Sequence, residues 1–171
     1  MKEDTLGLDF DGLFLRHRLW DFTYLAFYTF FRLPRWLERR INPKEISGAS
    51  ESIQKLKKRF DQRIYIVTKC NSVIAERTIS WLVQRGVISP QGLPEDHISF
   101  CKTRAEKNAI CEKLGINYFV DDRVDVLENL TSVHNRILFM PRRKELSRLR
   151  GCQTDIKIVY SWKELCEYLE P

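Results

Sequence analysis

The stretch LGLDFDG, at residues 6–12, decides both the fold and the chemistry expected of this chain. Apolar residues lead into Asp9, Asp11 follows two positions later, and Gly12 comes directly after it. A short apolar run bounded by a glycine is typical of a buried strand that ends in a turn. Two carboxylates at such a strand end indicate a metal or phosphate site.

Short apolar segments alternate with segments of helical spacing along the rest of the chain. Strands are expected at Leu6–Phe10, Ile64–Thr68, His97–Cys101, Tyr118–Val120, Arg136–Met140 and Ile156–Tyr160. Helices are expected at Ser50–Phe60, Val73–Arg85, Ala105–Leu114 and Trp162–Leu169. Thr103 and Glu106 have the spacing of a capping box, and Gly86 and Gly115 stand where helix C-caps are expected. This alternation predicts a three-layer, Rossmann-like α/β fold, with a parallel sheet and helices on both faces.

Polar residues follow three of the expected strands at their carboxyl ends. Asp9 and Asp11 follow the first strand, Thr68 ends the second, and Asp121 and Asp122 follow the fourth. Ligands of parallel α/β sheets bind at this edge. Carboxylates and a hydroxyl gathered there suit Mg²⁺ and a phosphate group.

The spacing of Asp9 and Asp11 suits phosphoryl transfer. A carboxylate can accept a phosphoryl group and form an aspartyl-phosphate, which divides one difficult displacement into two easier ones. A second carboxyl group is needed to protonate the leaving oxygen and later to activate water. Asp9 and Asp11 supply this pair, and Gly12 allows the backbone to turn sharply after them.

Four segments in order resemble the motifs of the haloacid dehalogenase-like (HAD) superfamily. DFDG at residues 9–12 resembles the first motif, and IYIVT at residues 64–68 resembles the second. A lysine before the fourth strand is the expected third element, and YFVDD at residues 118–122 resembles the fourth. The resemblance spans residues 6–125 and implies a magnesium-dependent phosphatase.

Within that resemblance, Asp9 is the nucleophile, Asp11 the general acid and base, and Thr68 a ligand of a phosphoryl oxygen. The lysine is Lys107 or Lys102. Lys107 is favoured, because the segment at residues 106–116 resembles the lysine segment of 5′-nucleotidase-like members. The metal candidates are the four aspartates of the first and fourth motifs, with Asp122 binding directly and Asp121 behind it: Asp9, Asp11, Asp121 and Asp122.

The sequence DDR at residues 121–123 resembles two HAD branches, the 5′(3′)-deoxyribonucleotidases and the 3′-phosphatase domains of polynucleotide kinase-phosphatases. This implies a nucleotide or another phosphorylated metabolite as substrate, with Arg123 and Asn71 as candidates to bind it. Arg123 can equally pair with a neighbouring acid. A polynucleotide 3′-phosphatase and a phosphoprotein phosphatase remain alternatives, as does a HAD-fold binding protein with an aromatic interaction surface.

Residues 13–46 interrupt the alternation and are expected to form a small helical cap within a single domain that spans residues 1–171. Their middle, Leu19–Leu33, is rich in aromatic residues but includes Asp21. It is shorter than the ~20 apolar residues that a membrane-spanning helix needs, so no transmembrane span is expected. The segment can act as a substrate cap, as a homodimer surface or as a contact with a membrane surface.

Composition and charge indicate which binding partners and which cellular compartment to expect. The chain has 171 residues and a formal net charge of +6, with basic blocks at residues 16–44 and 142–150 that suit an anionic partner, nucleic acid included. Its five cysteines form no C-x-x-C pair, which argues against a disulfide framework or a structural zinc site. The N-terminus has no signal-peptide pattern, so a cytoplasmic location is expected. Motifs of P-loop kinases and of dinucleotide-binding folds are absent.

Overall fold

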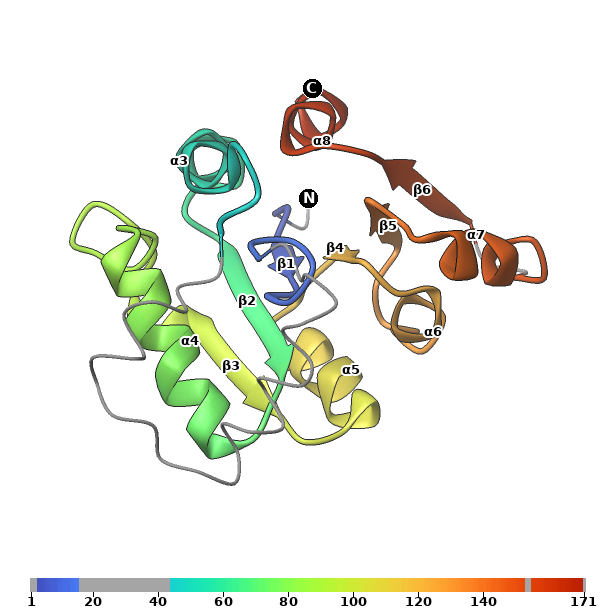
Figure 1. The fold of residues 1–171 in the computed structure, drawn as a ribbon, viewed down its shortest axis with the longest axis horizontal. Helices are drawn as coiled ribbons and strands as arrows, with labels where there is room; N and C mark the ends of the chain where they lie inside the picture. The colour runs from blue at the N-terminus through green and yellow to red at the C-terminus, as the bar shows by residue number, and fades with distance from the viewer. Residues whose placement is uncertain (1–2, 16–43, 153–154, 171) are drawn as a thin grey trace.

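The computed structural model describes residues 3–15, 44–152 and 155–170. Its centre is a six-stranded sheet in the order β3-β2-β1-β4-β5-β6, in which every pair of neighbours is parallel (Figure 1). The strands are β1 (Leu6–Leu8), β2 (Ile64–Lys69), β3 (Ile98–Cys101), β4 (Tyr118–Asp121), β5 (Asn135–Phe139) and β6 (Ile156–Val159).

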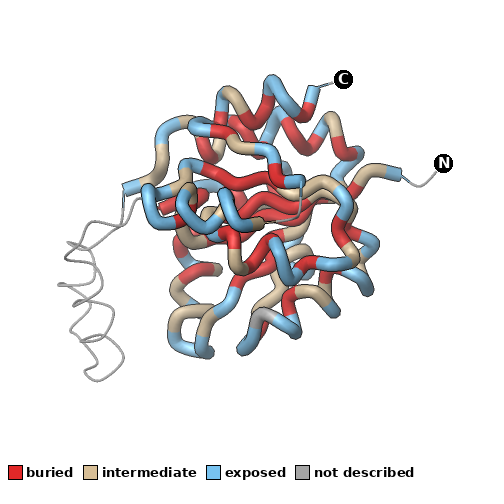
Figure 2. The backbone as a smooth tube through the Cα atoms, turned by 90° about the vertical axis from the view of Figure 1, so that its right-hand side faces the viewer, coloured by how far each residue is buried: buried red, intermediate tan, exposed pale blue. Residues whose placement is uncertain are grey.

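Helices cover both faces of this sheet. They are α3 (Ala49–Arg59), α4 (Ser72–Gln84), α5 (Arg104–Lys113), α6 (Val124–Leu127), α7 (Arg143–Leu149) and α8 (Trp162–Leu169), with a 3₁₀ turn η1 (Glu95–His97). Side chains of α3, α4 and α8 share one hydrophobic core with the sheet, whereas α5 and α6 share a second core on the other face. Buried residues are therefore concentrated in the sheet and on the inner sides of the helices (Figure 2). The predicted three-layer α/β fold is confirmed.

The strand order places a binding edge at the centre of the sheet. From β1 the chain moves outward through β2 to β3, then returns to β4 on the other side of β1. Leu8 is in register with Ile66 of β2 and with Val120 of β4, so the three strands end at one edge. A reversal of strand order of this kind opens a crevice at the carboxyl ends, which is where ligands bind in such sheets.

The boundary of β1 differs from the expected one. The strand ends at Leu8 instead of Phe10. Phe10 leaves the sheet because its ring packs against Phe14, at a centroid distance of 5.6 Å, and against Trp81. This aromatic packing draws the chain away from the sheet directly after Asp9.

Two short helices, α6 and α7, are not among the four helices that the apolar spacing predicts. Both lie after strands that end at the binding edge, α6 after β4 and α7 after β5. Each is too short for a clear helical period, which explains why periodicity does not reveal them.

The two ends of the segment at residues 13–46 lie side by side. The backbone N–H of Ile46 donates to the carbonyl of Phe14 at 2.8 Å, and Leu15 forms an antiparallel bridge with Glu45. The indole Nε1 of Trp162 donates to the carbonyl of Leu13 at 2.8 Å and fixes the first end to α8. The helical cap expected between these ends, including Leu19–Leu33, lies outside the described residues. Within the described ranges, no helix is both long and apolar enough to cross a bilayer.

Candidate active site

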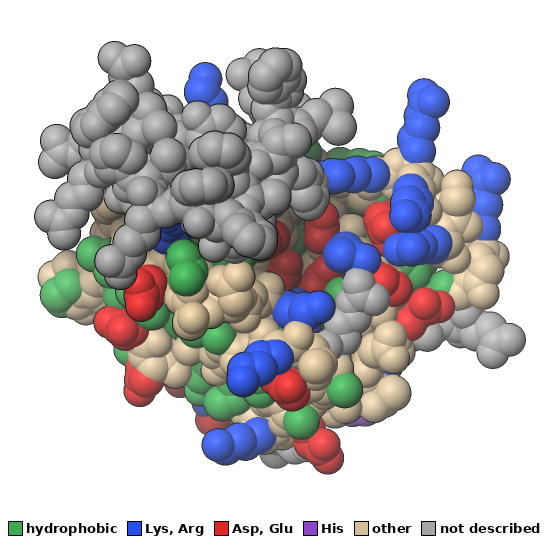
Figure 3. All heavy atoms as spheres, turned by 60° about the horizontal axis from the view of Figure 1, so that its bottom comes forward, with side chains coloured by type: hydrophobic (Ala, Val, Ile, Leu, Met, Phe, Trp, Pro, Cys, Tyr) green, Lys and Arg blue, Asp and Glu red, His purple; other side chains and the backbone are tan. Residues whose placement is uncertain are grey.

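Three carboxylates meet at the edge shared by β1 and β4. Asp9, Asp121 and Asp122 each offer an oxygen, and these oxygens all lie within 4.8 Å of one another. The backbone N–H of Asp9 donates to the carbonyl of Val120 at 2.9 Å, which holds the start of the loop after β1 against β4. Asp9 and Asp121 are buried, and Asp122 is half-buried. Figure 3 shows acidic side chains within a hollow of this face and basic side chains along its border.

Lys107 contacts two of these carboxylates. Its Nζ lies 2.8 Å from Oδ1 of Asp9 and 3.0 Å from Oδ2 of Asp121, and all three side chains are buried. The predicted capping box begins α5 here, since the hydroxyl of Thr103 accepts from the N–H of Glu106 at 3.2 Å. Lys107 follows in the first turn of that helix, and its ammonium group contacts the carboxylates at the ends of β1 and β4.

Lys102 has different surroundings. It is exposed, and its backbone N–H donates to Oε2 of Glu106 at 2.8 Å, which extends the cap at the start of α5. Of the two lysines that the sequence left open, the structure therefore brings Lys107 to the carboxylates.

Burial and mutual repulsion shift the ionisation of this group. Burial raises the pKa of Asp9, and the charge of Asp11 adds to the rise, while Lys107 and a hydrogen bond from Thr68 oppose it. Burial, opposed by Lys107, raises the pKa of Asp121 to about 8. Burial, with the charge of Asp9, raises the pKa of Asp122 to about 6.

The pKa of Lys107 is raised by its carboxylate neighbours. Burial lowers this pKa, but the charges of Asp121 and Asp9 outweigh burial and raise it. Lys107 therefore stays charged, yet one ammonium group cannot neutralise three carboxylates. Ionisation of all three carboxyl groups would therefore leave an excess of negative charge, which a bound cation would balance.

Asp122 is the carboxylate best suited to hold that cation. Both oxygens of Asp121 are engaged, Oδ2 by Lys107 and Oδ1 by the backbone N–H of Arg123 at 3.0 Å. Asp122 makes no hydrogen bond or ion pair with the described residues. Carboxylate oxygens are the ligands that Mg²⁺ prefers, so the residues present fit a magnesium ion held by Asp9 and Asp122. Asp11, a further metal candidate from the sequence, is not part of the three-carboxylate group.

Gly12 allows the loop after β1 to lie against Asp122. Its backbone is left-handed, with φ of 81°, a conformation that glycine adopts without steric cost. A Cβ atom at this position would lie 2.6 Å from Cγ of Asp122. Glycine is therefore required at position 12 for two reasons, the left-handed backbone conformation and the close approach of the Asp122 carboxylate.

The remaining candidates divide between the site and its border. Thr68 is buried at the end of β2 and its side chain hydrogen bonds to Asp9. Asp11 is half-buried, and its negative charge contributes to the raised pKa of Asp9. Asn71 is exposed, and its Oδ1 accepts from the N–H of Ile74 at 2.9 Å, so in this structure it caps α4. Arg123 pairs with Asp125, which is the neighbouring-acid arrangement that the sequence left open.

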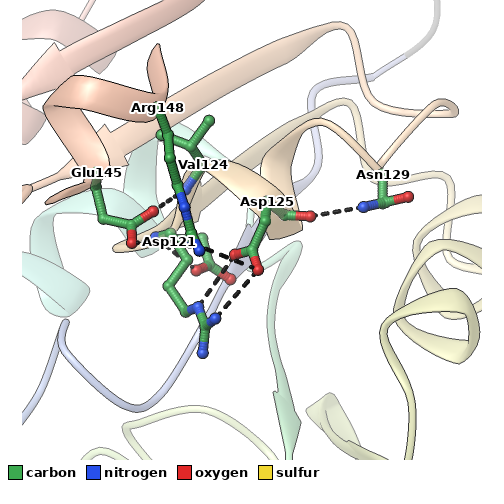
Figure 4. A network of polar contacts seen from close by, with 7 residues as sticks. Asp121, Val124, Asp125, Asn129, Glu145 and Arg148 are labelled. Carbon is green, nitrogen blue, oxygen red and sulfur yellow. Dashed lines mark hydrogen bonds and ion pairs between the residues drawn. The ribbon is translucent and has the colours of Figure 1, made fainter. Parts of the chain in front are cut away.

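One residue of the site region gave no clear signal in the sequence. Glu145 on α7 is buried, and its Oε2 accepts from the backbone N–H of Val124 at 3.0 Å (Figure 4). It thereby caps α6 and fixes the turn after β4, which carries Asp122. Its only trace in the sequence is that it is the single acid within the basic block at residues 142–150.

Comparison with known proteins supports the fold. No protein-family profile and no curated protein sequence matches this chain. Among solved structures, it resembles a protein of Burkholderia xenovorans assigned to the haloacid dehalogenase-like hydrolases, with a TM-score of 0.60, 12% identity, and coverage of 97% of this chain and 96% of that one. A haloacid dehalogenase-like protein of unknown function from Agrobacterium tumefaciens gives a TM-score of 0.61 at 14% identity, with 98% of each chain covered.

A third structure is assigned as a 3-deoxy-D-manno-octulosonate 8-phosphate phosphatase of Vibrio cholerae. It gives a TM-score of 0.51 at 15% identity, with coverage of 98% of this chain and 83% of that one. At such identities the likeness establishes the fold alone. The chain thus has the same α/β fold as these solved structures, with three carboxylates grouped where its strand order reverses.

Proposed function

We propose that this chain is a magnesium-dependent phosphomonoester hydrolase that acts through an aspartyl-phosphate on Asp9. A nucleotide or another phosphorylated metabolite is the proposed substrate. The observation that carries the proposal is the contact of Lys107 with Asp9 and Asp121, at 2.8 and 3.0 Å, inside a group of three carboxylates. The assignment of the Vibrio cholerae neighbour to a phosphatase supports the same reaction class.

In this reaction Asp9 attacks phosphorus, and a bond forms between its carboxylate oxygen and the phosphoryl group while the bond to the leaving oxygen breaks. Asp11 donates a proton to that leaving oxygen. Asp11 then takes a proton from water, and the water oxygen displaces the carboxylate of Asp9 and releases inorganic phosphate. Thr68 and Lys107 hold the phosphoryl oxygens through hydrogen bonds during both displacements.

Asp9 and Asp122 would hold the metal, with Asp121 and Lys107 behind them. When bound, Mg²⁺ neutralises the repulsion between an anionic nucleophile and an anionic substrate. Lys107 opposes the rise that burial causes in the pKa of Asp9, and it directs one of the Asp9 oxygens. Arg123, through its backbone N–H, fixes Asp121 and so the end of β4.

Hydrolysis of para-nitrophenyl phosphate with and without Mg²⁺ tests the proposal. Asp9→Asn is expected to remove nearly all of the Mg²⁺-dependent activity. Asp96→Asn is the matched control, because Asp96 is an exposed aspartate in η1, which precedes β3 and so lies toward the opposite edge of the sheet. An Asp9→Asn protein as active as the unaltered chain would contradict the proposal.

A substrate panel then separates the remaining alternatives. It consists of nucleoside 5′- and 3′-monophosphates, 3′-phosphorylated oligonucleotides and phosphopeptides. A preference for the monophosphates supports a nucleotidase, whereas preferences for the other two classes indicate a polynucleotide 3′-phosphatase or a phosphoprotein phosphatase. Absence of turnover with every member would favour a binding protein.

A further inference from the structure

Two arginines meet at one carboxylate oxygen on the border of the site. Nη2 of Arg123 lies 3.1 Å from Oδ2 of Asp125, and Nη1 of Arg148 lies 3.8 Å from the same oxygen. Arg123 follows directly after Asp122, whereas Arg148 comes from α7 (Figure 4). Residues far apart in the sequence thus place two guanidinium groups side by side.

Two acids beneath this arginine pair hold it in place. Asp125 accepts two bonds from Arg123, from Nε and Nη2, both at 3.1 Å. Glu145 accepts from Nη1 of Arg148 at 3.1 Å. The arginine side chains are 46% and 39% exposed, while those of Asp125 and Glu145 are only 24% and 10% exposed. The guanidinium groups therefore face solvent and the acids lie behind them.

The acids leave several donors of the pair unused. Nη1 of Arg123 has no hydrogen-bond partner in the described part of the chain, and neither have Nε and Nη2 of Arg148. A guanidinium group presents five N–H donors in a planar fork that matches phosphate geometry. Because Asp125 and Glu145 fix both side chains, little side-chain entropy would be lost when these donors bind an anion.

The arginine pair adjoins the candidate active site. The backbone N–H of Arg123 donates to Oδ1 of Asp121 at 3.0 Å. One arginine of the pair is therefore in direct contact with the three-carboxylate group. Arg142 follows β5 at the same edge, and its charge opposes the rise in the pKa of Asp122. The two residues that follow Arg142 in the sequence, Arg143 and Lys144, are also basic. This border is therefore suited to an anion, although the hollow beside it is acidic.

We propose that Arg123 and Arg148 bind a second phosphate group of the substrate, beside the phosphoryl group that Asp9 attacks. This inference rests on the proposed function and narrows its substrate class to phosphomonoesters with a second phosphate. The second phosphate can belong to a small bisphosphate or to the adjacent phosphodiester of a 3′-phosphorylated nucleic acid.

Binding measurements test this inference without requiring turnover. In an Asp9→Asn protein with Mg²⁺, calorimetry compares a nucleoside 3′,5′-bisphosphate with the nucleoside 3′- and 5′-monophosphates. The bisphosphate is expected to bind about tenfold more tightly, the gain typical of a charge-assisted hydrogen bond. Adding Arg123→Gln or Arg148→Gln should remove that advantage. Arg150→Gln, which removes the same charge from the exposed C-cap of α7, should preserve it.

The outcomes separate this inference from the proposed function. Equal affinity for bisphosphate and monophosphates, or an equal loss for both in the Arg123→Gln protein, would overturn the inference. Absence of Mg²⁺-dependent hydrolysis of any phosphomonoester by the unaltered chain overturns the proposed function instead.

A 3′-phosphorylated dinucleotide identifies the source of the second phosphate. If it binds as tightly as the bisphosphate, the adjacent phosphodiester serves as the second phosphate. If only the bisphosphate binds more tightly than the monophosphates, the substrate is a small molecule. Thermal unfolding of each variant shows whether loss of the α6–α7 contacts accounts for the change.

Discussion

The ammonium group of Lys107 lies 2.8 Å from Oδ1 of Asp9, although the two residues are 98 positions apart in the chain. The strand order explains the contact, because β1 lies between β2 and β4 while α5 connects β3 back to β4. The helix that returns the chain to the centre of the sheet thus carries the lysine to the carboxylates of both central strands.

Lys107→Met is expected to reduce Mg²⁺-dependent hydrolysis by about 10²–10³-fold, since a donor to the phosphoryl oxygens is lost. It also leaves two buried carboxylates without their cation, which costs about 3–5 kcal/mol of unfolding free energy. Added Mg²⁺ should recover part of that stability by neutralising the same carboxylates. Hydrolysis rates and urea unfolding with and without Mg²⁺ measure both effects.

Lys102→Met is the control for this substitution. Lys102 is exposed and enters the α5 cap only through its backbone N–H, which methionine retains. Its hydrolysis rate and unfolding free energy should stay within a factor of a few and about 0.5 kcal/mol of the unaltered chain. The reverse result, with Lys102→Met the more damaging change, would assign the phosphate-binding role to Lys102.

Gly12→Ala is expected to weaken Mg²⁺ binding. The substitution costs about 1–2 kcal/mol through the left-handed backbone, and its Cβ would meet Asp122 at 2.6 Å. Gly86→Ala isolates the two effects, because Gly86 has a φ of 69° but no atom within 4 Å of the added Cβ. Both variants should lose stability, whereas only Gly12→Ala should lose Mg²⁺-dependent stabilisation in thermal unfolding. Equal responses to Mg²⁺ would show that the contact with Asp122 does not matter.

The sequence was sufficient to predict the sheet, because every strand carries a local apolar signal and the strand–helix alternation restricts the topology. The capping box at Thr103 and Glu106 was predicted for the same reason, since its hydrogen bonds join residues close in the chain. Strand ends were less certain. Phe10 continues an apolar pattern, but its packing against Phe14 and Trp81 removes it from the sheet.

The candidate site was predictable as a set of residues but not as a geometry. Which lysine approaches Asp9 depends on how α5 is docked, and Lys107 and Lys102 lie on different sides of its start. The role of Glu145 depends on a contact between α6 and α7, and neither helix has a periodic pattern. Such tertiary contacts leave no local trace in a single sequence.

Stability of the metal-free protein should fall as the pH rises from about 4 to about 8. Burial raises the pKa of Asp122 to about 6 and that of Asp121 to about 8, above the ~3.9 of an unfolded aspartate. The folded state therefore binds more protons than the unfolded chain in this range, and each carboxyl group that ionises lowers the unfolding free energy. Mg²⁺ binds the ionised carboxylates and should offset the loss.

Urea unfolding at several pH values, in EDTA and in Mg²⁺, measures this dependence. The two curves should converge near pH 4 and separate as the pH rises. Asp122→Asn should remove the part of the decline that falls between about pH 4 and pH 6. Parallel curves in EDTA and Mg²⁺ would show that these carboxylates do not bind the ion.

Glu145→Ala is expected to weaken Mg²⁺ binding although Glu145 touches no metal candidate. The substitution leaves the buried N–H of Val124 without its acceptor, at a cost of about 1–3 kcal/mol of unfolding free energy, and frees the turn after β4 that carries Asp122. Glu164→Ala is the matched control, since Glu164 also accepts a backbone N–H, from Tyr160 at 2.7 Å, but at an exposed site on α8. Calorimetric titration with Mg²⁺ should show reduced affinity for Glu145→Ala alone. Glu145→Gln keeps an acceptor for the N–H of Val124, so it should restore most of the Mg²⁺ affinity. A Glu145→Gln protein as impaired as Glu145→Ala would mean that the negative charge of Glu145 matters more than its hydrogen bond.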